Sequence, residues 1–183
     1  MTGAAIGDDA VRGIRLDDSR VNDYSAPMVE KVQAEIKQKK PFRGREEEAF
    51  VNLLRTADVL LKGVAETLKP LGLSPTQYNV LRILRGAKPK GLSCREIGER
   101  MITRDPDVTR LLDRLEDRGL AERTRSREDR RVITTHITDD GLQLLGKLEA
   151  PIGDLHTRQM GHLKARQLRT LIELLEQTRN KAG

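Results

Sequence analysis

Apolar and polar residues recur along the chain with two periods, and the change of period separates helical from extended segments. From residue 46 to residue 69 the apolar side chains follow steps of three and four, the spacing of one helix face. A second helix is expected to begin at Ser74, because Pro75 and Gln77 after it are typical of a capped helix start. The stripe of the first helix is close to a heptad seam and consists of Phe50, Leu53, Leu54, Ala57, Leu60, Leu61, Val64 and Leu68.

The central segment of the chain, residues 105–119, predicts an amphipathic helix. Asp105 suits its N-cap, Pro106 its first position, and Gly119 the left-handed residue that ends it. Its apolar face consists of Val108, Leu111, Leu112 and Leu115. On an isolated helix the opposite face would simply be solvated. That face carries Asp107, Thr109, Arg110, Asp113 and Arg114.

The period becomes extended directly after Gly119. Residues 120–125 and 132–138 read as strands, and the six residues between them are too polar for a core. Upstream, Ser93 and Glu96 form a capping box that opens a short helix. Two helices, a turn between them and a hairpin with a basic tip describe a winged helix-turn-helix, whose second helix enters the DNA major groove. The expected fold class is therefore mostly α with a small β-hairpin wing (α+β).

The outer segments predict further helices. Residues 1–45 form an N-terminal extension, expected to be partly mobile with a short helix from residue 27 to residue 40. The basic cluster 37–45 fits either a solvated helix end or an extra phosphate contact. After the wing, Thr138 is expected to cap a long helix in which Pro151 causes a kink or restart. A final helix is expected to follow from about residue 164 to the C-terminus.

Charge refines this picture through its placement. The net charge is +6 and the pI about 9.7, which favours an anionic partner. Residues 91–140, however, contain eleven Arg and no Lys against twelve Asp and Glu, so the region is not basic as a whole. The guanidinium groups gather in the wing, where their planar shape suits bidentate contacts with phosphate or guanine. They belong to Arg123, Arg125, Arg127, Arg130 and Arg131.

The order and residues of these motifs resemble the MarR family of bacterial winged helix-turn-helix transcription regulators. The first helix of the motif matches over residues 92–99, and the second matches within 108–120. The wing matches over 129–131 and 137–141. The resemblance extends roughly from residue 46 to the C-terminus and leaves out the first forty or so residues.

The resemblance implies a homodimer. Residues 46–70 and 142–183 would be the dimerisation helices, and residues 74–141 the winged helix-turn-helix. It further implies that Arg131 enters the minor groove, with the Asp129 carboxylate fixing the direction of its guanidinium group.

The resemblance also implies a small-molecule effector, often an aromatic or phenolic anion. Its pocket would lie between the dimerisation layer and the winged helix-turn-helix, and the second predicted helix would line part of it through Tyr78 and Arg82.

Taken together, the sequence predicts a DNA-binding transcription regulator, a ligand-responsive repressor that binds a pseudo-palindromic operator as a homodimer. Arg110 and Arg114 are expected at base edges, supported by Thr109 and Asp107. Two alternatives stay open: an architectural protein with little sequence preference, and a helical interaction protein that no longer binds DNA. The residues expected at phosphates are Ser93, Arg104, Arg125, Arg127 and Arg130.

Other chemistry finds little support in the sequence. Cys94 lies at the first position of a capped helix, where a redox role and a passive small residue are both conceivable. The three histidines lack the spacing of a metal site, and no catalytic motif is recognisable, so neither an enzyme nor a cofactor is expected. No apolar run predicts a membrane span or a secretory signal, which favours the cytoplasm.

Overall fold

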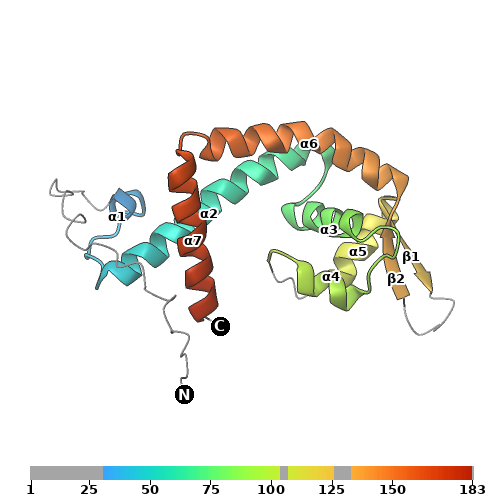
Figure 1. The fold of residues 1–183 in the computed structure, drawn as a ribbon, viewed down its shortest axis with the longest axis horizontal. Coiled ribbons are helices and arrows are strands. Elements are labelled where there is room, and N and C mark those ends of the chain that lie inside the picture. The colour runs from blue at the N-terminus through green and yellow to red at the C-terminus, as the bar shows by residue number, and fades with distance from the viewer. Residues whose placement is uncertain (1–30, 104–106, 126–132, 183) are drawn as a thin grey trace, which may run out of the picture. The chain divides into compact units, whose positions relative to one another are not determined.

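The structure, a computed structural model, describes residues 31–103, 107–125 and 133–182 (Figure 1). It confirms the expected fold class, since the described residues form helices and one antiparallel two-stranded sheet. The chain divides into two compact units, residues 1–52 and 53–183, and helix α2 begins in the first and ends in the second. The elements in chain order are α1 (Lys31–Glu35), α2 (Arg45–Leu68), the 3-10 helix η2 (Lys69–Leu71), α3 (Pro75–Gly86), α4 (Cys94–Arg100), α5 (Val108–Asp117), β1 (Ala121–Arg125), β2 (Ile133–Ile137), α6 (Asp139–Met160) and α7 (Ala165–Ala182).

The first unit contains α1, which is shorter than the sequence predicted. The helix ends at Glu35, and Lys37 takes a φ of 55°, a left-handed conformation that α-helices do not continue through. The Gln33 side chain then donates hydrogen bonds to the carbonyl oxygens of Gln38 and Lys40, both at 3.2 Å. The prediction of a helix reaching residue 40 is therefore wrong, and the start predicted at residue 27 lies outside the described residues.

Local capping chemistry explains where three helices of the second unit begin. Ser74 and Gln77 close a reciprocal capping box at the start of α3, and Ser93 and Glu96 close one at the start of α4. The Thr138 hydroxyl accepts a hydrogen bond from the Gly141 backbone N–H at 3.1 Å and begins α6. All three caps are confirmed, because each depends on residues within one helical turn.

The start of α5 differs from the prediction. Its N-cap is Asp107, whose carboxylate accepts a hydrogen bond from the Arg110 backbone N–H at 3.1 Å. The prediction that Asp105 caps this helix is therefore wrong, and Asp105 and Pro106 lie outside the described residues. Two Asp residues two positions apart are equally good caps by sequence. The C-terminal end is as predicted, with Gly119 in the left-handed region at φ 65°.

Helix α6 also differs, because it runs without interruption from Asp139 to Met160 and contains Pro151. The predicted restart is wrong. A proline removes one hydrogen bond from the helical ladder, whereas three apolar side chains around it remain buried and keep α6 in place. These are Leu148, Ile152 and Leu155. None of the described helices is both long and apolar enough to cross a membrane.

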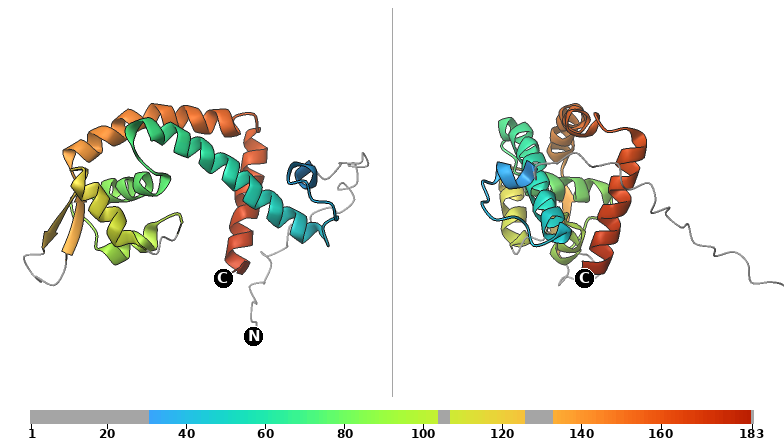
Figure 2. Two further views of the ribbon diagram at one scale, coloured as in Figure 1. Left: turned by 180° about the vertical axis from the view of Figure 1, so that it is seen from behind. Right: turned by 90° about the vertical axis from the view of Figure 1, so that its left-hand side faces the viewer.

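The wing is the β1–β2 hairpin, which follows directly from α5 (Figures 1 and 2). Its register pairs Ala121 with Ile137 at the base and Arg125 with Ile133 toward the tip. Leu92, just before α4, adds an isolated antiparallel bridge to Thr135, with N–O distances of 2.7 and 3.0 Å. The bridge attaches the middle of β2 to the loop that leads into α4.

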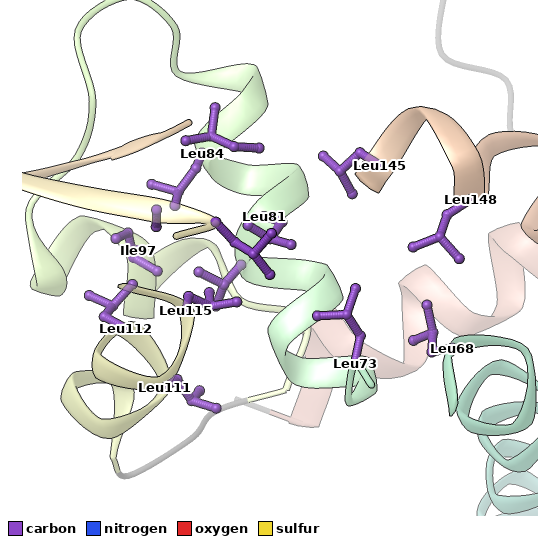
Figure 3. Packing of buried hydrophobic residues seen from close by; sticks show 14 of the residues in the cluster. Leu68, Leu73, Leu81, Leu84, Ile97, Leu111, Leu112, Leu115, Leu145 and Leu148 are labelled. Atoms are coloured by element: carbon purple, nitrogen blue, oxygen red, sulfur yellow. The ribbon is translucent and has the colours of Figure 1, made fainter. Parts of the chain in front are cut away.

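The core of the second unit lies where α3, α4 and α5 meet β1, β2 and α6 (Figure 3). Leucines predominate among its fully buried side chains, as the low aromatic content requires. Gly141 allows α6 to pass close to Leu120, the residue directly before β1, since a Cβ at position 141 would collide with the Leu120 carbonyl oxygen. The largest fully buried side chains are Leu68, Leu81, Leu84, Ile97, Leu112, Leu115, Leu145, Leu148 and Val80.

Candidate nucleic-acid interface

Helix α5 presents one buried and one exposed face. Leu111, Leu112 and Leu115 are buried against the core, as the sequence predicted. Thr109, Arg110 and Arg114 are exposed on the other side. The side chain of Arg110 is 77% accessible, so its guanidinium group is free to approach a groove. Two short helices followed by a hairpin are the arrangement of a winged helix-turn-helix, in which α5 takes the place of the second helix.

Asp107 organises the start of this helix. One carboxylate oxygen accepts the Arg110 N–H, and the other lies 3.1 Å from Arg110 Nε. The same residue therefore caps α5 and holds the Arg110 side chain near the helix start. Sequence reasoning assigned Asp107 a supporting contact to bases, whereas its carboxylate is already occupied within the protein.

Ser93 is similarly engaged. Its hydroxyl donates to Glu96 Oε2 at 2.7 Å and accepts from the Glu96 N–H at 3.3 Å, while its own N–H donates to Glu96 Oε2 at 2.8 Å. These bonds lower the pKa of the Glu96 carboxyl group from its usual range, the Ser93 hydroxyl contributing most. A phosphate contact by the Ser93 hydroxyl would have to share or replace the bond to Glu96.

The wing supplies Arg125, which is exposed at the end of β1. The remaining wing and turn residues predicted to contact DNA lie outside the described residues. They are Arg104, Arg127, Asp129, Arg130 and Arg131.

Arg123 has a position that sequence reasoning missed. It was counted among the wing arginines, but its side chain points back to α5 and is only 26% accessible. Nη1 donates to Asp113 Oδ1 at 2.6 Å and to Glu116 Oε2 at 3.1 Å, and Nη2 donates to the Thr109 carbonyl oxygen at 3.2 Å. The alternation of β1 contained the signal, because Arg123 shares a strand face with the buried Ala121.

Three further residues singled out by sequence make defined contacts. The Arg82 guanidinium lies 5.7 Å from the centre of the half-buried Tyr78 ring, within the range of a cation–π contact. Cys94 is an exposed free thiol, and its Sγ lies 3.7 Å from Thr109 Oγ1 on α5. Among the described residues, no group of three or more His, Cys, Asp or Glu could hold a metal ion.

Comparison with known proteins decides the family. A MarR family model matches residues 71–132, which extend from the end of η2 into the wing. The chain is also 32% identical over 111 residues to the HTH-type transcriptional regulator YkoM of Bacillus subtilis, covering 58% of this chain and 71% of that protein. The chain belongs to the MarR family. As a MarR family member it is a DNA-binding transcription regulator.

Solved structures agree with this assignment. A MarR transcription factor from Planctomyces limnophilus is 45% identical with a TM-score of 0.58, covering 74% of this chain and 98% of that one. A mutant MarR from E. coli, complexed with operator DNA, is 26% identical with a TM-score of 0.63, covering 69% and 89%. CouR from Rhodococcus jostii RHA1, bound to p-coumaroyl-CoA, is 26% identical with a TM-score of 0.63, covering 74% and 94%.

Proposed function

We propose that this MarR family regulator is a ligand-responsive repressor that binds a pseudo-palindromic operator as a homodimer. The observation that carries the proposal is the exposed face of α5, where Thr109, Arg110 and Arg114 stand opposite a buried leucine face. Each subunit would place α5 in the major groove, and the two grooves would be about one helical turn apart. The wing of each subunit would lie along the adjacent backbone.

The proposed contacts fall into two classes. Arg110 and Arg114 would contact guanine in the groove, with Thr109 beside them and Asp107 setting the direction of Arg110. Ser93 and the arginines would bind phosphate and fix the register of the protein on the duplex. These arginines are Arg104, Arg125, Arg127 and Arg130. Arg131, directed by Asp129, would enter the minor groove.

A homodimer is supported by the apolar side chains that one chain leaves exposed. Phe50 is 61% accessible and Leu54 54% on α2, and Ile172 and Leu174 are each 55% accessible on α7. Exposed apolar residues concentrated on the first and last long helices are typical of a surface that a partner covers. We infer that residues 46–70 and 142–183 of two chains form the dimer, which would bury them.

An aromatic or phenolic anion is the proposed effector. Tyr78 offers an aromatic face and Arg82 an exposed cation beside it, a pairing suited to a planar anion. CouR, which is 26% identical, was solved with p-coumaroyl-CoA, a phenolic thioester with an anionic carrier. A panel of phenols and aromatic carboxylates tests the proposal, because an effector should release the protein from its operator and Arg82→Ala should weaken that response.

The DNA-binding proposal is tested by selecting bound duplexes from a random pool. The protein should enrich a sequence with two half-sites about one turn apart, and it should prefer the selected duplex over random duplex by about a thousandfold or more. Equal affinity for both, with a steep salt dependence, would favour the architectural alternative instead. The absence of any salt-dependent duplex binding would favour the interaction protein.

A further inference from the structure

Arg123 links three points of α5 to the wing. Its two terminal nitrogens bind the carboxylates of Asp113 and Glu116 and the Thr109 carbonyl oxygen, at 2.6 to 3.2 Å. In addition, the Arg123 backbone N–H donates to the other Glu116 oxygen at 3.3 Å. One residue of β1 thus holds more than one turn of α5, and β1 continues directly to the exposed Arg125.

Without a neighbouring cation, the carboxylates of Asp113 and Glu116 would repel the phosphates of bound DNA. Asp113 follows Thr109 by four residues and Arg110 by three, so it projects from the same side of α5 as the proposed base contacts. Its side chain is 48% accessible and that of Glu116 41%, so both remain close enough to the surface to repel phosphate. Like charges brought together at an interface oppose binding strongly.

We propose that Arg123 is a positioning residue for DNA binding, which neutralises Asp113 and Glu116 and fixes the wing on α5 without touching DNA itself. The inference rests on the proposed function. Its side chain is only 26% accessible and both of its terminal nitrogens already bind acceptors on α5, so little of the guanidinium group is left for a phosphate contact. A guanidinium group suits this role better than an ammonium group, because its two terminal nitrogens can bind acceptors at separate points of α5, whereas an ammonium group donates from a single nitrogen.

A double-mutant cycle tests the inference. The Arg123→Met protein is compared with wild type, with the Asp113→Asn/Glu116→Gln protein and with the combination of all three changes. Binding is measured on the selected duplex and on a fixed random duplex across a salt series. Arg123→Met should weaken binding to both duplexes about tenfold at low salt, and by less at higher salt, because salt screens the repulsion between the exposed carboxylates and phosphate. The amide changes should alter wild-type affinity by no more than about threefold but restore most of the loss in Arg123→Met.

Two outcomes would overturn the inference. If the amide changes raised affinity equally with and without Arg123, the arginine would not mask these carboxylates. If Arg123→Met flattened the salt slope by about one unit even in the Asp113→Asn/Glu116→Gln background, Arg123 would be a phosphate contact. Thermal unfolding shows which variants fold. Should Arg123→Met fail to fold, Arg123→Lys replaces it in the cycle, with an expected loss of about threefold because the charge is kept and the fork is lost.

The ion pair between Arg85 and Glu149 serves as a matched control. It joins α3 to α6 at 2.7 Å, similar to the 2.6 Å contact of Arg123, but it does not contact α5. Arg85→Met should leave DNA affinity unchanged, and a loss equal to that of Arg123→Met would contradict a specific role for Arg123. Failure of the proposed function gives a different result from failure of this inference. Wild type would then bind the selected and random duplexes with equal affinity, and the effect of Arg123 on affinity could still be measured on either duplex.

Discussion

Arg118 and Gly72 are joined by a hydrogen bond of 2.7 Å, from Arg118 Nη1 to the Gly72 carbonyl oxygen. Arg118 Nη2 donates a second one to the Leu71 carbonyl oxygen at 2.9 Å. Arg118 is the C-cap residue of α5, and Gly72, with a φ of 65°, ends η2 after α2. The end of the proposed groove-reading helix is therefore bound to the turn that follows the first long helix, which carries exposed apolar side chains.

Arg118→Met is expected to lower the free energy of unfolding by about 1 kcal/mol, since two exposed backbone carbonyls lose charged donors but gain water. Chemical denaturation measures this change. Because α5 loses its link to the turn after α2, affinity for the selected duplex should also fall. Arg100→Met, on the exposed end of α4, is the comparison for the loss of one charge. Equal affinity in both variants would mean that the Arg118 contacts do not position α5.

Local sequence patterns predicted most of this fold because the interactions that set helix starts and strand faces are local. Ser74, Ser93 and Thr138 cap helices through bonds to residues three positions ahead, so the sequence contains both partners. The same local logic could not choose between Asp105 and Asp107. At Pro151 local reasoning was misleading. Helix α6 continues through this residue because neighbouring side chains are buried, and burial depends on tertiary packing.

The candidate site was predicted less completely for a similar reason. The exposed face of α5 follows from helical periodicity, so Arg110 and Arg114 were found from sequence alone. The contacts of Arg118 and Arg123 join residues brought together only by the fold, and the sequence offered no partner for either. Most of the proposed phosphate and minor-groove contacts lie outside the described residues, so their assignment stays a prediction from the sequence.

Two substitutions of Asp107 distinguish its role as the N-cap of α5 from its role in positioning the Arg110 side chain. Asp107→Ala should destabilise the protein by about 1 kcal/mol through loss of the α5 cap, whereas Asp107→Asn, also a good cap, should cost only a few tenths. Both changes remove the charge that pairs with Arg110. Chemical denaturation of the two variants therefore measures the contribution of the cap to stability, and duplex binding measures the contribution of the ion pair to affinity. If Asp107→Asn binds the selected duplex as well as wild type does, the ion pair does not direct Arg110.

Glu96 predicts a pH dependence of stability. Its pKa in the folded protein is lowered by the Ser93 hydroxyl, so its capping contribution is present above the usual pKa of a glutamate, about 4.3. That contribution is lost as the pH falls through the lower, folded-state value. The difference in melting temperature between wild type and Glu96→Ala should therefore shrink on acidification. Ser93→Ala should show the same convergence, and a difference that stayed constant down to low pH would exclude this role for the carboxylate.

The proposed dimer can be tested by a substitution that should change the stability of the single chain very little. Ile172 is 55% accessible on α7, so Ile172→Asp should change the stability of one chain by no more than about 0.5 kcal/mol. In a dimer the same aspartate would be buried without a partner, which is strongly unfavourable. Light scattering should show a dimer for wild type and a monomer for the variant. A monomeric wild type, or an Ile172→Asp protein that remained dimeric, would contradict the proposal.

Removing the exposed arginines of α5 and removing that of β1 should change DNA affinity in different ways. Arg110→Ala or Arg114→Ala should cost about 1–3 kcal/mol on the selected duplex and much less on random DNA, because contacts to guanine depend on sequence. Arg125→Ala should weaken both duplexes alike and reduce the salt slope by about one, because a phosphate contact releases counterions without reading bases. Arg95→Ala is a control for charge loss, since Arg95 on α4 already pairs with Glu99 at 2.9 Å. If Arg110→Ala and Arg125→Ala weakened both duplexes by the same factor, α5 would not read bases and the architectural alternative would be favoured.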